Sequence, residues 1–147
     1  MVYESIEILF IEDSPADAML TIRALAKSGL TNKLHHVIDG EAALDFIYCK
    51  GAYASAPKRE RLKLILLDLK MPKVSGMQVL EKIKSDPNMS HIPVVILTSS
   101  KEDPDIKKCY ALGANSYIVK PVESDNFFLA LKELGLYWMI LNQPPQQ

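Results

Sequence analysis

Residues 62–76 read LKLILLDLKMPKVSG, and this stretch decides the fold. Its apolar run is continuous rather than alternating, which is typical of a strand buried on both faces of a parallel sheet. Asp68 follows the centre of that run, and Gly76 opens a segment with apolar residues at helical spacing. The stretch therefore predicts a strand over Leu62–Leu69, a loop, and a helix that begins at Gly76.

The same strand-then-helix pattern occurs five times along the chain. The other apolar runs predict strands at Ile6–Ile11, Leu34–Ile38, Pro93–Thr98 and Ser116–Val119. Amphipathic segments predict helices over Pro15–Ser28, from Glu41, from Gly76 to Asp86, from Asp103 to Gly113 and from Ser124 to Gly135. Because right-handed crossovers join parallel strands, this (βα)₅ pattern predicts an α/β fold, an open parallel sheet with helices on both faces.

The composition is that of a single domain, residues 1–147. Hydrophobic residues make up 48% of the 147, which suffices for one sizeable core. The 17 Lys and Arg residues and 18 Asp and Glu residues give a net charge of −1. A chain without a basic surplus lacks the electrostatic footprint of nucleic-acid binding, so we expect no nucleic-acid partner.

No segment predicts a membrane partner or export. The longest apolar runs, Ile8–Ile11 and Tyr137–Leu141, fall far short of the roughly 20 residues that a membrane span needs. The amino terminus has acidic residues where a signal peptide needs basic ones. Cys49 and Cys109 lack a metal-binding spacing, so we expect reduced thiols of a cytoplasmic protein, with a disulfide as the alternative. The three histidines also lack such a spacing, and we expect them at the surface.

The carboxyl ends of the predicted strands carry the residues that can do chemistry. Glu12 and Asp13 follow the first strand, Asp68 lies at the third, Thr98 closes the fourth and Lys120 follows the fifth. Ligands of open α/β sheets bind beyond these ends, so we expect the five side chains to converge. Three neighbouring carboxylates need a positive partner, and oxygen ligands without His or Cys suit Mg²⁺. With the metal in place, one carboxylate can attack a phosphorus centre.

Each of these residues also has an ordinary interpretation. A single strand-end Asp is usually a turn residue, and a single Lys-Pro pair usually lies at the surface. Placement of all five at matching strand ends is what favours a functional site.

Four motifs at these strand ends resemble the response-regulator receiver domain. They are Glu12-Asp13, Asp68–Pro72 leading to Gly76, Thr98-Ser99 and Lys120-Pro121. The resemblance covers roughly residues 6–134 and implies a flavodoxin-like fold with strand order 2-1-3-4-5. Many receivers carry Ala where this chain has Ser99, a small change that leaves room for a phosphate.

The resemblance implies a phosphoacceptor and a metal site. Asp68 would accept the phosphoryl group, while Asp13, Asp68 and the backbone carbonyl of Lys70 would bind Mg²⁺. Glu12 would hold the metal through water. The chain would be a switch rather than an enzyme, limited to self-phosphorylation from small donors and slow loss of the phosphoryl group.

The resemblance also implies how the switch responds. Lys120 would pair with the phosphoryl oxygens, Thr98 would reach for the phosphate on activation, and the Lys120-Pro121 peptide would be cis. Tyr117 occupies the position of the switch aromatic, although a half-buried strand tyrosine without that role fits the sequence equally well. The responding surface would comprise the fourth helix, the fifth strand and the fifth helix.

Residues 135–147 extend beyond the expected receiver core. Residues 134–141 are nearly all apolar, which predicts either an interface or a further segment packed on the same chain. This extension and the long loop before the third strand resemble the small receivers paired with cyanobacterial phytochromes. That resemblance implies a light-sensing histidine kinase as phosphodonor and a homodimer formed through the fourth and fifth helices.

Three rival functions share parts of this pattern. A flavodoxin-type flavin carrier needs a phosphate loop after the first strand, where Glu12-Asp13 would repel the phosphate. Phosphatases with an Asp nucleophile carry an Asp-x-Asp motif whose second Asp serves as the acid/base. In this chain Lys70 stands two residues after Asp68 instead. A pseudo-receiver that binds proteins without phosphorylation is the remaining alternative, but such proteins usually lose one of the residues that this chain retains.

Overall fold

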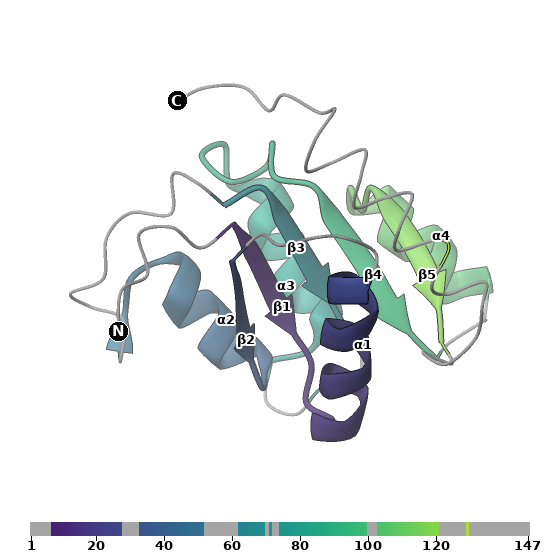
Figure 1. Cartoon of the computed structure of the whole chain (residues 1–147). Coiled ribbons are helices and arrows are strands. Elements are labelled where there is room, and N and C mark those ends of the chain that lie inside the picture. The colour runs from purple at the N-terminus through teal and green to yellow at the C-terminus, as the bar shows by residue number, and fades with distance from the viewer. Residues whose placement is uncertain are drawn as a thin grey trace.

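Five strands form one sheet, and all of them pair in parallel (Figure 1). They are β1 (Ile8–Ile11), β2 (Leu34–Val37), β3 (Leu64–Leu67), β4 (Val94–Thr98) and β5 (Ser116–Val119). The strand order is β2-β1-β3-β4-β5, which confirms the predicted fold and order. The computed structural model describes residues 7–27, 33–51, 62–69, 71, 74–99, 103–120 and 129.

Four helices lie between the strands in this part of the chain. They are α1 (Pro15–Lys27), α2 (Gly40–Ile47), α3 (Gly76–Ser85) and α4 (Asp103–Ala111). The predicted N-cap of α1 is confirmed, because the Ser14 hydroxyl accepts a hydrogen bond from the Asp17 N–H at 3.3 Å. Asp39 caps α2, and Ser75 forms a capping box with Gln78 at the start of α3. None of these helices has the length and apolar character needed to cross a membrane.

The third strand is shorter than its sequence predicts. Only Leu64–Leu67 belong to the ladder, although Leu62 and Leu69 on either side are also buried. An apolar run marks where side chains are packed, and the packed region extends beyond the residues whose backbones pair. The fourth helix likewise ends at Ala111 rather than at Gly113, whose φ of +107° is incompatible with a right-handed helix.

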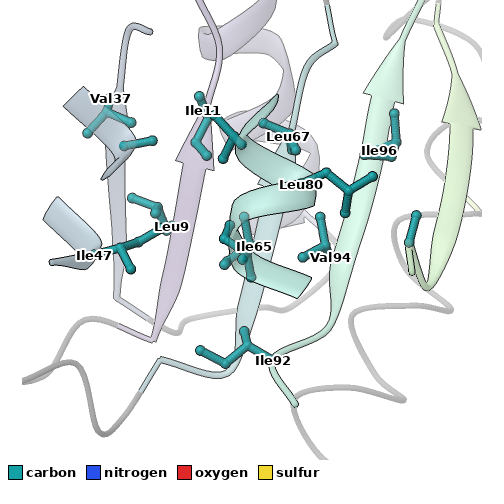
Figure 2. Packing of buried hydrophobic residues seen from close by; sticks show 14 of the residues in the cluster. Leu9, Ile11, Val37, Ile47, Ile65, Leu67, Leu80, Ile92, Val94 and Ile96 are labelled. Atoms are coloured by element: carbon teal, nitrogen blue, oxygen red, sulfur yellow. The ribbon is translucent and has the colours of Figure 1, made fainter. Parts of the chain in front are cut away.

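The sheet has an apolar core on each face, because successive strand side chains point to opposite sides. On one face, α2 and α3 pack against alternate strand residues; Figure 2 shows Leu9 and Ile11 of β1 there, with Leu80 of α3 over the neighbouring strands. On the other face, α1 packs against the intervening residues, including Ile8 and Phe10. The predicted coverage by helices on both faces is therefore confirmed.

Lys84 joins three elements at the amino-terminal end of β4. Its ammonium group donates to the carbonyls of Ser90 (3.0 Å) and Ile92 (2.8 Å) and to Oδ1 of Asn115 (3.1 Å). The same Asn115 oxygen accepts the Val94 N–H at 2.9 Å. Burial lowers the pKa of Lys84, but three acceptors satisfy the three donors of an ammonium group. The end of α3 is thereby tied to the starts of β4 and β5.

Several predicted features lie outside the described residues. They are the fifth helix between Ser124 and Gly135 apart from Leu129, the extension 135–147, most of the loop 50–61, Lys70, and the Lys120-Pro121 peptide together with Pro121.

Gly76 is required where α3 starts against the loop that follows β3. A Cβ atom at this position would lie 2.2 Å from the Asp68 carbonyl oxygen and 2.6 Å from the Leu69 Cα. Both neighbours are backbone atoms, so no side-chain rotation would relieve the overlap. The Gly76 N–H also donates to the Leu69 carbonyl at 2.9 Å. The missing side chain lets α3 pack directly on the backbone that carries Asp68.

We therefore predict that Gly76→Ala destabilises the protein and displaces Asp68. The expected loss in the free energy of unfolding is about 1–3 kcal/mol, the usual cost of overpacking. Urea unfolding measures the stability, and Mg²⁺ titration reports the displacement. Glu81→Ala, an exposed change on the same helix, is the control and should stay within about 0.5 kcal/mol of the parent. A Gly76→Ala protein as stable as the parent would show that the contact relaxes without cost.

Candidate functional site

The pairing of β1 with β3 brings three carboxylates to one end of the sheet. Ile11 lies opposite Leu67, and the Asp68 N–H donates to the Ile11 carbonyl at 3.0 Å. Glu12 and Asp68 therefore follow directly after paired residues, with Asp13 one residue further on. One carboxylate oxygen from each of the three lies within 4.8 Å of the others. The convergence predicted for these acids is present.

The three carboxylates differ in their exposure to water. Glu12 and Asp68 are buried, with 1% and 6% of their surface exposed, whereas Asp13 is exposed. Buried like charges at this separation repel one another and need a compensating cation. The ligand set consists only of oxygen atoms, and one of its members is open to solvent. It therefore fits Mg²⁺, which binds proteins through one or two carboxylates and retains several waters.

Burial and the neighbouring charges together change the ionisation of Glu12. Burial, together with the negative charge of Asp68, raises the pKa of Glu12 to about 7, although the hydrogen bond from Lys120 opposes the rise. A carboxylate with such a pKa holds a proton for about half the time at neutral pH. Positive charge added beside Asp68 would favour the ionised form.

Lys120 places a positive charge beside the acidic cluster. Its Nζ lies 2.6 Å from Glu12 Oε1 and 2.9 Å from Asp17 Oδ2. Burial alone would lower the pKa of Lys120, but the hydrogen bonds to these two carboxylates and the charge of Asp68 raise it. The ammonium group is therefore firmly charged. Its backbone N–H donates to the Thr98 carbonyl at 2.8 Å, which fixes where β5 ends relative to β4.

Thr98 and Tyr117 lie on the same face of the sheet. Ile96 pairs with Tyr117, and both belong to the core cluster under α3 and α4. Thr98 is two residues after Ile96, so strand alternation turns it to this face as well. Thr98 is fully buried at the end of β4, and Tyr117 is half-buried. Both alternatives for Tyr117 remain compatible with this position.

Two contacts at the site were not predicted from the sequence. Asp17, in the first turn of α1, reaches Lys120 from an element that carries none of the predicted site residues. His36 of β2 bonds through Nε2 to the backbone carbonyl of Glu12 at 2.7 Å. An acidic residue three positions after an N-cap was a signal for the former, but it is equally typical of any helix start.

The three histidines were expected at the surface, and the structure shows each of them only partly exposed. His35 stacks on Phe46, with ring centroids 4.7 Å apart, and His36 contacts Phe10. Both are half-buried in β2, because this edge strand is covered by α2 on one side. Cys49 and Cys109 are free thiols, as expected.

The sequence also matches a known protein family, in agreement with this geometry. A sequence profile described as the response regulator receiver domain matches residues 8–132. The chain belongs to the response-regulator receiver family. The matched range contains every described strand and helix, as well as the acidic cluster and Lys120.

Two curated relatives resemble this receiver over nearly its whole length. The probable methanogenesis regulatory protein FilR2 of Methanothrix harundinacea is 38% identical over 94% of this chain and 86% of its own. The response regulator Rcp1 of Synechocystis is 37% identical over 90% of this chain and 88% of its own.

Solved receivers share the fold closely. The Mn²⁺-bound form of Rcp1 superposes with a TM-score of 0.82 at 36% identity, covering 94% of this chain and 97% of the other. The phosphorylated cyanobacterial phytochrome response regulator RcpA gives a TM-score of 0.82 at 37% identity, covering 96% and 99%. A divalent cation and a phosphorylated form are thus known in similar receivers, and the acidic cluster here has the ligand type to hold such a cation.

We predict that Mg²⁺ binding by this receiver weakens as pH falls below about 7. A proton on Glu12 lowers the negative charge of the site, and the metal must displace it, since the pKa of Glu12 is about 7. Between pH 8 and pH 6 the apparent affinity should fall about ten-fold. Isothermal titration calorimetry at the two pH values measures it.

Two variants separate this effect from general acid sensitivity. Glu12→Gln should remove the pH dependence, because nothing is left to protonate at that position. Asp13→Asn should bind Mg²⁺ more weakly at both pH values yet keep the dependence. Equal affinity of the parent at pH 6 and pH 8 would contradict the assignment.

Proposed function

We propose that this receiver is a response regulator whose Asp68 accepts a phosphoryl group in a Mg²⁺-dependent reaction. The observation that carries the proposal is the burial of the Asp68 carboxylate, 6% exposed, against the other two acids of the cluster. Asp13, Asp68 and the backbone carbonyl of Lys70 would hold the metal, and Glu12 would contact it through water. Known receivers of similar sequence include a Mn²⁺-bound and a phosphorylated form, which supports both parts.

The chemistry is a transfer between two side chains. The N–P bond of a donor phosphohistidine breaks, an O–P bond forms to an Asp68 carboxylate oxygen, and the imidazole nitrogen keeps the bonding electron pair. Phosphoryl transfer depends mostly on positioning and on neutralised oxygen charge, and the latter is what the metal supplies. Lys120, held 2.6 Å from Glu12, stands ready to donate to the phosphoryl oxygens. The chain then acts as a switch and turns over no outside substrate.

The response would pass through Thr98 and Tyr117. Thr98 ends β4 beside the loop that leads to α4, so a move of its hydroxyl toward the phosphoryl group shifts that loop. Tyr117, on the same face of the sheet, would turn into the vacated space. This is a local charge event that biases a two-state element, here the surface of α4, β5 and the predicted fifth helix.

The proposed donor is a sensor histidine kinase of the phytochrome type, and this chain would act in the cytoplasm. The structure of RcpA, a cyanobacterial phytochrome response regulator, superposes on 96% of this chain at 37% identity. FilR2 is as similar, and its name concerns methanogenesis. The loop before β3 and the extension after residue 135 favour the phytochrome group, whose small receivers they resemble.

Self-association is the second part of this proposal. The dimer would use α4, β5, the predicted fifth helix and the extension 135–147. Two large side chains on this proposed dimer face are exposed, Tyr110 of α4 at 49% and Leu129 at 52%. Aromatic residues are enriched in interface cores, which supports the choice of face.

We predict that Asp68→Asn abolishes phosphorylation. The amide cannot form the acyl phosphate, and Glu12, the other buried acid of the cluster, is paired with Lys120. The protein is incubated with acetyl phosphate and Mg²⁺, and the adduct is located by peptide mass spectrometry. The same assay with a purified phytochrome kinase and with a kinase of another sensor class tests the donor.

Asp39→Asn is the matched control. Asp39 is a second buried aspartate. It is the N-cap residue of α2, a role that asparagine fills equally well. This variant should be phosphorylated like the parent. Undiminished labelling of Asp68→Asn would exclude Asp68 as the phosphoacceptor.

A further inference from the structure

The ammonium group of Lys120 has two carboxylate partners, and they come from different elements. Glu12 follows β1, whereas Asp17 belongs to the first turn of α1. Asp17 is held in place because its own N–H donates to the Ser14 hydroxyl at 3.3 Å. Lys120 thus bridges α1 to the end of β5.

The two ion pairs differ sharply in their exposure to water. The Glu12 side chain is 1% exposed, the Lys120 side chain 10% and the Asp17 side chain 37%. A carboxylate buried as deeply as Glu12 cannot replace its partner with water. A carboxylate that is more than a third exposed can, so its pairing with a lysine is readily exchanged.

Glu12 is also fixed from its second oxygen. Its Oε2 accepts the Ser14 N–H at 3.3 Å, while Oε1 accepts Lys120. Both oxygens are therefore engaged in the resting protein. Of the two partners of Lys120, Asp17 is the one that can leave.

We propose that Asp17 holds Lys120 in the resting state and releases it when a phosphoryl group forms on Asp68. This inference rests on the proposed phosphorylation of Asp68. The phosphoryl group brings a charge of about −1.5 to −2 and three strong acceptors, so it attracts the ammonium group more strongly than the partly exposed Asp17 carboxylate does. Lys120 keeps Glu12 and exchanges Asp17 for a phosphoryl oxygen. Asp17 is thus a positioning residue that competes with the phosphate.

The exchange has a measurable consequence. On this proposal phosphorylation breaks the Asp17 pair, so the pair would lower the affinity of the site for a phosphoryl analogue. Asp17→Asn removes the competing charge and keeps the shape. Its affinity for berylliofluoride at saturating Mg²⁺ should be about two- to five-fold higher than that of the parent, as expected for loss of one partly exposed ion pair.

Two control variants separate competition from a general change in charge. Asp17→Glu keeps the carboxylate and should bind berylliofluoride like the parent. Glu41→Gln removes an acid from the first turn of α2, which starts at the same edge of the sheet, and should leave the affinity unchanged. An equal gain in Glu41→Gln would show a general field effect and overturn the proposal.

The second measurement is the side-chain ammonium NMR signal of Lys120. In the parent it should shift when berylliofluoride is added, because one partner is replaced. In Asp17→Asn the signal without berylliofluoride should already be displaced from that of the parent, and the further shift should be smaller. A signal unchanged by the substitution, or an affinity equal to the parent's, overturns the proposal.

The outcomes also distinguish the inference from the proposed function. A parent protein that binds berylliofluoride, beside an Asp17→Asn variant of the same affinity, overturns the exchange alone. A parent protein that fails to bind it, and is not labelled by acetyl phosphate, overturns the phosphoacceptor assignment together with the exchange.

Discussion

Mutual repulsion of carboxylates at the junction of β1 and β3 is the constraint on which the other features of this site depend. Parallel pairing of the two strands leaves their following residues no freedom to separate, and burial of Glu12 and Asp68 removes the water that would screen them. Burial and the Asp68 charge raise the pKa of Glu12, and partial protonation of Glu12 relieves part of the repulsion. Lys120 relieves another part. The repulsion that remains favours a small hard cation, on which the proposed phosphoryl transfer depends.

The surrounding fold keeps that repulsion from being relaxed by movement. Apolar cores on both faces hold β1 and β3 in place. Gly76 lets α3 press on the backbone of Asp68, and the Asp68 N–H is bonded to Ile11. The buried acids Glu12 and Asp68 are thus held on firmly packed strands. Such an arrangement suits a switch, because binding energy is not lost in rearranging the metal ligands.

Most of the fold and the central site could be predicted from the sequence, for physical reasons that differ from residue to residue. Continuous apolar runs such as 64–67 mark buried parallel strands, and the first polar residue after each run marks its carboxyl end. That rule alone finds Glu12, Asp68 and Lys120. Asp17 escaped it because a helix residue reaches the site through the angle at which α1 leaves the sheet, and no sequence period encodes that angle. The contact of His36 with the Glu12 carbonyl was hidden likewise, since it depends on strand register.

Lys84 limits which parts of β4 and β5 are free to move. Its three hydrogen bonds fasten the starts of β4 and β5 to the end of α3. The opposite ends of the same two strands carry Thr98 and Lys120, the residues expected to respond. We therefore expect Lys84 to act as a fixed point, so that a displacement beside Asp68 would move the far ends of β4 and β5 more than their starts.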